Sequence, residues 1–278
     1  MIINKMPIGF NNRVLPGFTY TGNYQVIDDG DDGWRIKFLT SGTLKLDRRS
    51  KIDVFCVGGG SSGGTEAFYS ENPSGWAGIV FGCFGGGGGY TTTLKGVNAY
   101  PNTNYQITVG AGGAVYPSYN STNMAEFSYN RGNPSYAFGC VANGGGSPYV
   151  VDGGNRGGNY ASEGPSESYP PENGGSDGYY YGSQYGPTTR EFGDPSGALY
   201  AGGGGGSAGS NYPNSYGNGG DVGGGHGASV SSAATNGTEN TGGGGGGGLV
   251  RYGSSSQILK RPGGAGGSGI VIIRNHRA

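Results

Sequence analysis

The sequence predicts an all-β protein that also contains polyglycine helices: a small antiparallel β-sandwich with an inserted bundle of packed left-handed polyglycine-II helices. Three observations lead to this prediction. Glycine makes up 67 of the 278 residues, against roughly 7% in ordinary proteins. Short apolar stretches alternate at period two, and no segment sustains the 3.6-residue period of a helix. Aliphatic side chains are scarce, because hydrophobic residues are 33% of the chain and include 21 Tyr.

The first strands are predicted between residues 14 and 57. Residues 34–38 and 43–46 alternate apolar and polar side chains and are separated by a turn around Ser41 and Gly42. Residues 52–57 are mainly apolar and run directly into three glycines. Cys56 lies in this run and is predicted to be a small buried side chain.

Later strands follow from the same reasoning. Residues 90–94 and 104–109 are rich in β-branched and aromatic side chains, and 98–103, which contain Pro101, are predicted to form a turn between them. Residues 270–274 are the most apolar run, typical of a strand buried on both faces. We expect this strand to join the sheet of residues 34–57, which makes the glycine-rich region an insertion. The stretches 137–141 and 198–201 are expected to pack on the sandwich.

The predicted domain boundaries follow these changes in composition. Residues 1–16 are an N-terminal arm, and residues 17–113 together with 269–274 form the β-sandwich base with the first glycine runs. Residues 114–268 form the polyglycine-helix bundle with its Tyr-rich loops, and 275–278 are a tail.

The three uninterrupted glycine runs begin and end at Gly85 and Gly89, Gly202 and Gly206, and Gly242 and Gly248. Flexible linkers have such a composition, but these runs continue strands, recur at similar lengths and are separated by apolar or aromatic residues. A polyproline-II-type helix has no internal hydrogen bonds, so its N–H and C=O groups point toward neighbours. We therefore expect an ordered bundle in which the runs hydrogen-bond to one another.

Several stretches in this order resemble the glycine-rich domain of phage and prophage tail-fibre and tail-tip proteins. They are WRIKFLTSGTL at 34–44, DVFCVGGG at 53–60, GGGGGYT at 85–91, YQITVGAGG at 105–113, TTREFG at 188–193, LYAGGG at 199–204 and GGSGIVIIR at 266–274. The arrangement is also similar to the glycine-rich module in the ectodomain of anaplastic lymphoma kinase and its relatives. The resemblance implies a β-sandwich carrying polyglycine helices, with loops presented to a bacterial surface.

Charge argues against nucleic acid as a partner, because 17 basic and 18 acidic residues nearly cancel. No run approaches the ~20 apolar residues of a membrane-spanning helix, and the N-terminus lacks the apolar stretch of a signal peptide. The three cysteines, Cys56, Cys83 and Cys140, are expected to be structural thiols, with a bridge or a reactive thiol as the alternative.

No catalytic, metal or cofactor site is predicted. The glycine runs lack the following helix of a dinucleotide fold and the Lys-Ser/Thr of a phosphate loop. The acidic segment 28–33 is expected to be a polar turn, with weak calcium binding as the alternative. His226 and His276 are expected at the surface, and Arg190 with Glu191 as a local structural pair. Four acids are expected in solvated loops rather than as a glycosidase pair, namely Glu163, Glu167, Glu172 and Asp177.

Aromatic residues in loops of Gly, Ser, Asn and Pro are the candidate binding residues. Antibody paratopes use a similar combination of rigid aromatics and small polar side chains, and flat aromatic faces suit sugar rings. Coverage of the bundle's outer faces is the structural alternative. The candidates are Trp76, Tyr116, Tyr119, Tyr179, Tyr180, Tyr181, Tyr185, Tyr212 and Tyr216.

The sequence thus predicts a non-enzymatic phage tail-fibre or tail-tip protein or adhesin, located in the virion and made in the host cytoplasm. Its expected partners are a bacterial surface glycan or outer-surface protein and other tail or fibre proteins, and self-association into a homo-oligomer is compatible with the sequence. The alternatives are a purely structural virion or cell-surface protein and, third, an ice-binding protein, for which Thr-lined repeats are not evident.

Overall fold

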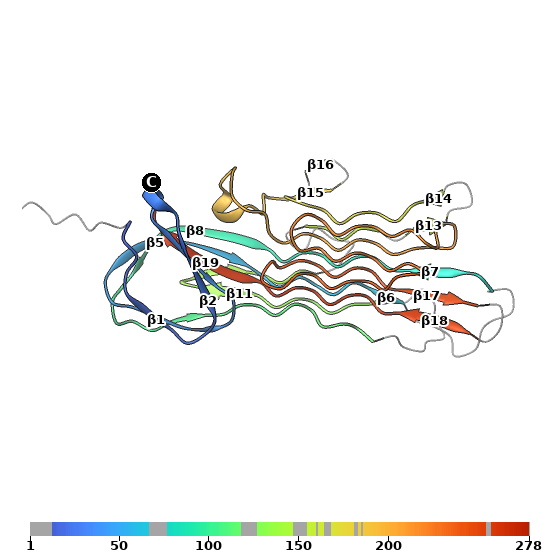
Figure 1. Ribbon diagram of the computed structural model, residues 1–278, viewed down its shortest axis with the longest axis horizontal. Helices are drawn as coiled ribbons and strands as arrows, with labels where there is room; N and C mark the ends of the chain where they lie inside the picture. The colour runs from blue at the N-terminus through green and yellow to red at the C-terminus, as the bar shows by residue number, and fades with distance from the viewer. Residues whose placement is uncertain are drawn as a thin grey trace, which may run out of the picture.

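The computed structural model shows an elongated molecule with strands at one end and long glycine-rich segments running away from them (Figure 1). It describes residues 13–66, 77–117, 127–146, 155–159, 161–163, 168–180, 183–184, 186–253 and 257–277. Within these ranges the regular structure is β, apart from two short 3-10 turns, η1 (Gly30–Asp32) and η2 (Glu191–Gly193). The prediction of an all-β chain is therefore confirmed.

A five-stranded antiparallel sheet forms the centre of the strand-rich end. Its order is β2-β3-β19-β5-β8. The strands are β2 (Tyr24–Asp28), β3 (Trp34–Phe38), β5 (Ser50–Val57), β8 (Thr91–Ala99) and β19 (Ile270–Asn275). β19 pairs with β3 on one side and with β5 on the other. The C-terminal apolar run thus returns to the sheet of residues 34–57, as the sequence predicts.

A second, three-stranded sheet lies against the first. It contains β1 (Phe18–Tyr20), β4 (Gly42–Leu46) and β9 (Tyr105–Ile107) in the order β1-β4-β9. Side chains from both sheets form one buried cluster, to which β3 and β4 contribute Ile36, Phe38 and Leu44. The apolar members of β3 are buried and its polar members are half-buried, which is the pattern of a strand with one face in the core.

The predicted turn at residues 98–103 is wrong at its N-terminal side. β8 continues to Ala99, and the turn lies at Pro101 and Asn102 instead. The strand continues because Ser50 of β5 still has a pairing partner in Ala99, and the Ala99 side chain is fully buried. Pairing with β5 therefore outweighs the local preference of these residues for a turn.

A short hairpin covers part of the core, as predicted for residues 137–141. β11 (Ser135–Ala137) and β12 (Cys140–Ala142) pair antiparallel, and Ala137, Cys140 and Ala142 join the buried cluster. The two residues between the strands, Phe138 and Gly139, both have positive φ, as a tight hairpin turn requires. Tyr200 and Ala201 of the other predicted stretch pack with Phe55 of β5 in a second cluster.

The glycine-rich segments are joined by backbone hydrogen bonds that repeat every third residue. Successive N–H groups of segment 58–64 donate to three neighbouring segments in turn. Every third N–H returns to the same neighbour, where the number of the acceptor residue is lower by three. The pairs are Gly58 to Tyr90, Ser61 to Gly87 and Gly64 to Phe84; Gly59 to Asn133 and Ser62 to Asn130; and Gly60 to Gly267 and Gly63 to Gly264. These three neighbours therefore run antiparallel to segment 58–64.

Three segments have neighbours on all sides. Segment 58–64 donates to segments 84–90, 130–133 and 264–267 and accepts from 113, 145 and 245–248. Segment 242–248 donates to 61–64, 202–205 and 235 and accepts from 86–89, 225–228 and 264–267. Segment 201–208 donates to 83–86, 172–175 and 222–228 and accepts from 158–161, 217–220 and 244–247. Two of the three uninterrupted glycine runs thus lie at the surrounded positions.

Close approach of the backbones leaves no room for side chains in these segments. A Cβ added at Gly204 would lie 2.0 Å from the carbonyl oxygen of Gly245, and one added at Gly246 would lie 1.7 Å from that of His226. Both distances are far below any real contact of a Cβ atom. Only glycine therefore fits at these positions.

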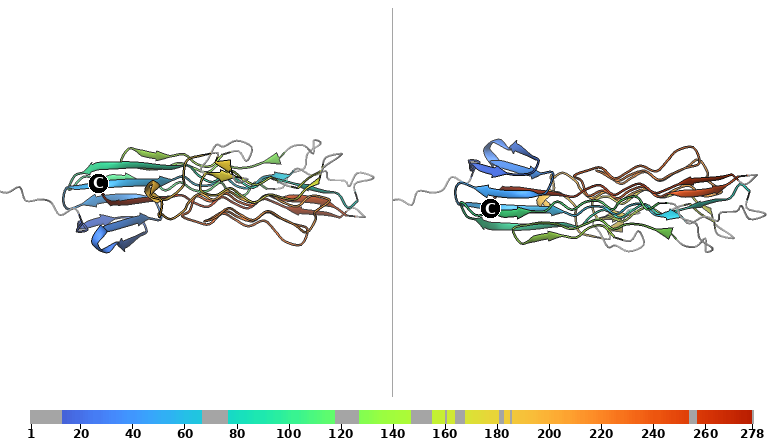
Figure 2. Two further views of the ribbon diagram at one scale, coloured as in Figure 1. Left: turned by 90° about the horizontal axis from the view of Figure 1, so that it is seen from above. Right: turned by 90° about the horizontal axis from the view of Figure 1, so that it is seen from below.

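Short strands lie toward the end of the glycine segments that is remote from β1 to β5 (Figures 1 and 2). One sheet there has the order β18-β17-β7, and β10-β6 and β13-β14 are two-stranded. The pair β15-β16 lies nearer to the strand-rich end, along the length of the glycine segments (Figure 1). Their bounds are β6 (Thr65–Glu66), β7 (Val80–Gly82), β10 (Phe127–Ser128), β13 (Ser162–Glu163), β14 (Ser168–Tyr169), β15 (Tyr179–Tyr180), β16 (Ser183–Gln184), β17 (Leu249–Tyr252) and β18 (Ile258–Arg261). We call this remote end the distal end and the strand-rich end the base.

Candidate functional site

The predicted aromatic candidates do not form one cluster. Trp76, Tyr119, Tyr181 and Tyr185 lie outside the described residues, and of Tyr180 only the backbone in β15 is described. The remaining four are Tyr116, Tyr179, Tyr212 and Tyr216. The prediction that they bind a receptor stays a prediction.

Tyr212 and Tyr216 lie together in the loop that joins segments 201–208 and 217–220. The Tyr216 side chain is 42% exposed, and its ring contacts the ring of His226 edge-on at 6.0 Å. The Nδ1 atom of His226 accepts a hydrogen bond from the Gly219 N–H at 3.3 Å, while the residue itself is exposed, as predicted. The Tyr216 ring of this loop and the His226 ring of the neighbouring segment 222–228 therefore lie side by side, and both residues are exposed.

Tyr179 lies near the other end of the segments. Segment 172–175 runs antiparallel to 203–206, because Gly203 donates to Gly175 and Gly206 donates to Glu172. Tyr179 follows Gly175 toward the base, whereas Tyr212 follows Gly206 toward the distal end. The structure thus separates these two candidates along the length of the bundle, although both loops are at the surface.

Tyr116 and Tyr169 are two further described tyrosines near the distal strands. Tyr116 is half-buried, and its carbonyl oxygen accepts a hydrogen bond from the Thr65 hydroxyl at 2.8 Å. Tyr169 in β14 was not among the candidates, yet its side chain is 52% exposed. Its position in a Ser- and Pro-rich loop was the signal that could have identified it.

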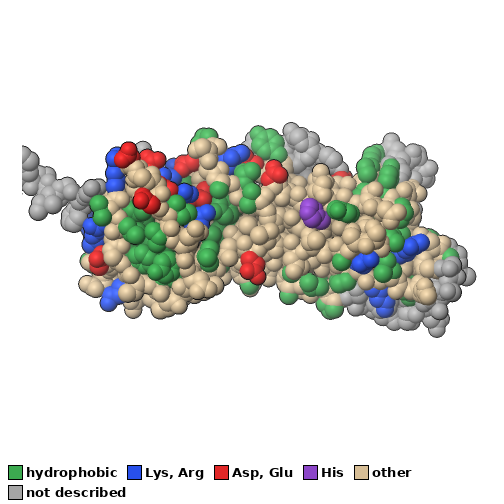
Figure 3. Space-filling view, viewed as in Figure 1, with side chains coloured by type: hydrophobic (Ala, Val, Ile, Leu, Met, Phe, Trp, Pro, Cys, Tyr) green, Lys and Arg blue, Asp and Glu red, His purple; other side chains and the backbone are tan. Residues whose placement is uncertain are grey.

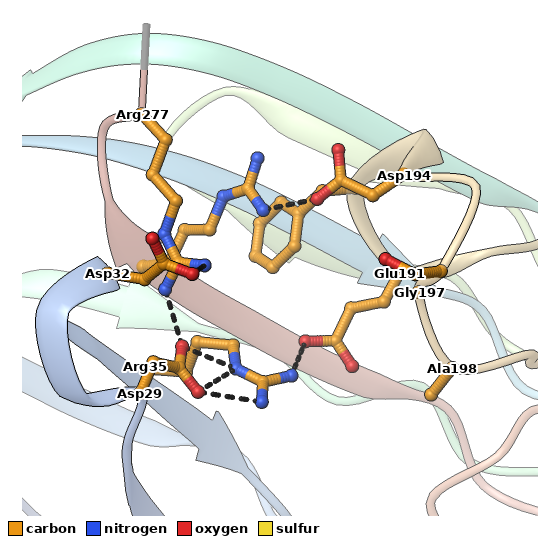
Figure 4. Close-up of a pocket in the computed structure, with 11 residues that line it drawn as sticks. Asp29, Asp32, Arg35, Glu191, Asp194, Gly197, Ala198 and Arg277 are labelled. Carbon is orange, nitrogen blue, oxygen red and sulfur yellow. Dashed lines mark hydrogen bonds and ion pairs between the residues drawn. The ribbon is translucent and has the colours of Figure 1, made fainter.

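A pocket of about 480 Å3 lies at the base where three distant segments meet (Figure 4). It was not predicted from the sequence. Its wall combines four carboxylates with three arginines and is completed by Phe192 and small residues. The lining residues are Asp29, Asp32, Arg35, Glu191, Phe192, Asp194, Ser196, Gly197, Ala198, Arg274 and Arg277.

One side of the pocket is organised around Arg35 of β3. Its guanidinium donates to both carboxylate oxygens of Asp29 and, at 2.6 Å, to Glu191, which is only 2% exposed. Glu191 also accepts from the Tyr200 hydroxyl at 3.2 Å. Burial alone would raise the pKa of Asp29, but hydrogen bonds from Arg35 and Arg277 lower it below its ordinary value. The Asp29 carboxylate is therefore ionised at neutral pH, and Arg35 holds both Asp29 and Glu191 in place.

The other side is organised around Arg274 of β19. Its side chain is 5% exposed, stacks over the Phe192 ring at 4.0 Å and forms ion pairs with Asp53 and Asp194. Asp53 is fully buried and is also 2.6 Å from Nδ1 of His276. Burial acts to raise the pKa of Asp53, but hydrogen bonds from His276, the Gly96 amide and Arg274 lower it.

Three predictions about charged residues are wrong. His276 is not a simple surface residue, because it contacts the buried Asp53. Arg190 and Glu191 do not form a pair: Arg190 binds Asp177 at 2.9 Å, while Glu191 binds Arg35 from β3. Asp177 is accordingly half-buried and paired rather than solvated. For Glu191, a partner distant in sequence replaces the neighbouring arginine.

The remaining acids and cysteines fit a structural role. The side chains of Glu163 and Glu167 are not among those described, and Glu172 accepts from the Asn159 amide at 3.1 Å. All three cysteines are free and buried. Cys83 donates to Glu66 at 3.2 Å, and burial raises the pKa of Glu66 to about 7 although this hydrogen bond acts to lower it.

Metal-ligand clusters and membrane spans are not found in the described ranges. No group of three or more His, Cys, Asp or Glu side chains there could hold a metal ion. None of the described segments forms a helix with the length and hydropathy needed to cross a bilayer. The predicted polar turn at residues 28–33 contains η1, with the Asp28 carboxylate accepting from the Gly30 amide.

The comparison with family models assigns the chain. The model described as glycine-rich domain matches residues 39–276, which include all the extended segments and the strands from β4 to β19, but not β1, β2 and β3. The chain therefore belongs to the glycine-rich domain family. A search of curated proteins found no match.

Proposed function

We propose that the extended segments are left-handed polyglycine-II helices and that the two sheets form a β-sandwich. The hydrogen bonds that return to the same neighbour every third residue support this, because such a helix has three residues per turn and no internal hydrogen bonds. Strands would give a repeat of two. The buried cluster shared by the two sheets supports the sandwich.

We propose further that the protein is a non-enzymatic phage tail-fibre or tail-tip protein or adhesin. In this proposal the helix bundle is a rigid scaffold, and its loops recognise a glycan or a protein on the bacterial surface. The observation that carries it is the elongated bundle (Figure 1), with the described loop at residues 209–216 following segment 201–208 at the end away from the base. Partners would include other tail or fibre proteins, and neither nucleic acid binding nor membrane insertion is part of the role.

The distribution of side chains agrees with a scaffold. Hydrophobic side chains gather over the base, whereas the middle of the molecule shows mainly backbone and small polar groups (Figure 3). Exposed aromatic side chains of the bundle lie in a loop and in two-stranded hairpins: Tyr216 in the loop is 42% exposed, and Tyr179 in β15 is 48% exposed. Binding energy would come from such aromatics, because they bury a large area with few rotatable bonds.

Binding of labelled protein to whole cells of a panel of bacterial species tests this function. Replacing Tyr212 and Tyr216 by Ser, or Tyr179 to Tyr181 by Ser, should reduce binding at least about tenfold, the loss of one to two anchoring contacts. Tyr24→Ser with Tyr100→Ser is the matched control, because these tyrosines are 46% and 51% exposed on the base.

The outcomes separate the two leading roles. Binding that is lost in the loop variants and kept in the control supports an adhesin. Folded protein that binds no species in the panel, or loop variants that bind like wild type, would favour the alternative of a purely structural virion or cell-surface protein.

A further inference from the structure

We propose that the pocket at the base binds a neutral saccharide unit, independently of the bundle loops. The proposal rests on the arrangement of its fixed and its available polar groups. It goes beyond the receptor-binding function proposed above, because the pocket residues come from the base and from the segment around η2. Its volume of about 480 Å3 is in the range of small-ligand sites.

The inner wall of the pocket is held rigidly. Arg35 is fixed by Asp29 and Glu191, and Arg274 by Asp53 and Asp194. Glu191 and Asp53 are 2% and 0% exposed. Side chains locked in this way lose little entropy when a ligand binds, so their remaining hydrogen-bonding capacity is available at low cost.

Backbone conformation at η2 supports a binding role. Phe192 has φ of 57° and ψ of 11°, a left-handed conformation that is uncommon for a bulky side chain. It places the buried ring under Arg274. Strain of this kind is found at functional sites, where the surrounding structure maintains it.

Polar groups at the rim of the pocket form only some of the hydrogen bonds and ion pairs of which they are capable. Asp32 is 76% exposed, and its nearest cation, Arg277, is 3.9 Å away. Arg274 contacts one oxygen of Asp194, whose carboxylate is 40% exposed, which leaves the second oxygen available. Nη1 of Arg277 is 3.9 Å from Asp32, beyond hydrogen-bond distance, and the Arg277 side chain is 26% exposed.

The mixture of groups selects the class of ligand. In Figure 4 Asp194 lies across the pocket from Asp32 and Arg277; the two carboxylates can accept hydrogen bonds from a ligand, and the Arg277 guanidinium can donate one. An anion would be repelled by the two carboxylates, and a cation by Arg274 and Arg277. A neutral ligand with neighbouring hydroxyl groups can donate to the carboxylates and accept from Arg277, and a monosaccharide has this pattern.

Nuclear magnetic resonance titration of the 15N-labelled protein tests the proposal. The probes are glucose, galactose, mannose, rhamnose and N-acetylglucosamine, each at about 20 mM, a concentration that detects a Kd in the millimolar range. At least one sugar should shift the amide signals of Asp32, Gly197 and Ala198. Sodium sulfate and calcium chloride at the same concentration should not.

Two variants and one control complete the experiment. Ser196→Trp places a large ring at the exposed rim and should weaken binding at least about tenfold, and Asp32→Ala should weaken it severalfold. Asp31→Ala is the matched control, because Asp31 is an exposed neighbour of Asp32 that does not line the pocket. It should bind like wild type.

The proposal is overturned if no sugar shifts these amides, if only sulfate or calcium does, or if Ser196→Trp and Asp32→Ala bind like wild type. Its failure is distinguishable from failure of the adhesin proposal. Cell binding that depends on Tyr212 and Tyr216 would persist in Ser196→Trp, and sugar binding in the pocket would persist in the loop variants.

Discussion

Individual glycines in the bundle differ sharply in what surrounds them. At Gly88 an added Cβ would lie 1.9 Å from the carbonyl oxygen of Ala201, whereas at Gly87 the nearest described atom would be 3.6 Å away, an ordinary contact. Neither residue has a positive φ. Neighbouring members of one run therefore provide a matched pair that separates close packing from backbone flexibility.

Gly88→Ala should destabilise the protein by at least about 2 kcal/mol, because backbone atoms would have to move to make room. Gly87→Ala should be neutral or should stabilise it by up to about 1 kcal/mol, since alanine restricts the unfolded chain. Urea denaturation of both variants measures the difference. Equal effects of the two substitutions would contradict the packing described for this run.

Titration of Glu66, in β6 at the distal end, makes the stability of the folded protein depend on pH. The side chain is 6% exposed, and burial raises its pKa to about 7, above the value near 4.3 of an unfolded chain. The folded state therefore keeps the proton that the unfolded state has lost. The stabilisation from this group is complete below pH 4 and is lost as the pH rises toward 7, by at most about 1.4 kcal/mol per unit.

Glu66→Gln removes this titration while keeping the shape of a neutral carboxyl. Unfolding free energy of the wild type should fall between pH 5 and 7 relative to the variant, so the variant should be the more stable protein at pH 8. Chemical denaturation across this range is the measurement. A constant difference between the two proteins at all pH values would show that Glu66 does not titrate there.

Among the elements, those with strong local patterns were predictable. The alternation of apolar and polar residues predicted β3. The apolar run at residues 270–274 predicted β19 and its pairing in the sheet, because a strand buried on both faces needs neighbours on both sides. The two-residue strands β13 to β16 have no such pattern within Tyr- and Ser-rich sequence. The pocket could not be predicted from the sequence either, because its charged residues come from segments 29–35, 191–198 and 274–277. These segments meet only in the tertiary fold.

Segment 242–248 should behave as one protected element in amide hydrogen exchange. The amides of Gly244 to Gly248 donate to backbone carbonyls of neighbouring segments, so they should exchange only through global unfolding. Ala114 and Val115 are exposed and have no backbone acceptor among the described residues, so they should exchange orders of magnitude faster. If the amides of Gly244 to Gly248 exchange as rapidly as those of Ala114 and Val115, the glycine segments do not form an ordered bundle.

At the scale of the whole molecule, the sheet and the bundle should unfold together. Segment 58–64 follows directly after β5, and segment 264–267 lies shortly before β19. The two segments are hydrogen-bonded to each other. A charge introduced at Val271, which is fully buried, costs several kcal/mol, much of the stability of a typical domain. Val271→Asp should therefore abolish both the sheet and the protection of the glycine amides.

Leu94→Asp is the control for this variant, because Leu94 is 38% exposed on β8. It should retain a cooperative thermal transition measured by circular dichroism. Glycine amides that stay protected in Val271→Asp would show instead that the bundle folds without the sheet.

The position of β19 at the centre of the five-stranded sheet also determines when the protein can fold. This strand is made after all the others, yet β3 and β5 need it between them. At 5–20 residues per second, synthesis up to residue 275 takes on the order of tens of seconds. Until then segments 58–64 and 242–248 also lack their last neighbour, segment 264–267. Because the glycine runs carry no apolar side chains, they expose little hydrophobic surface while they wait for it.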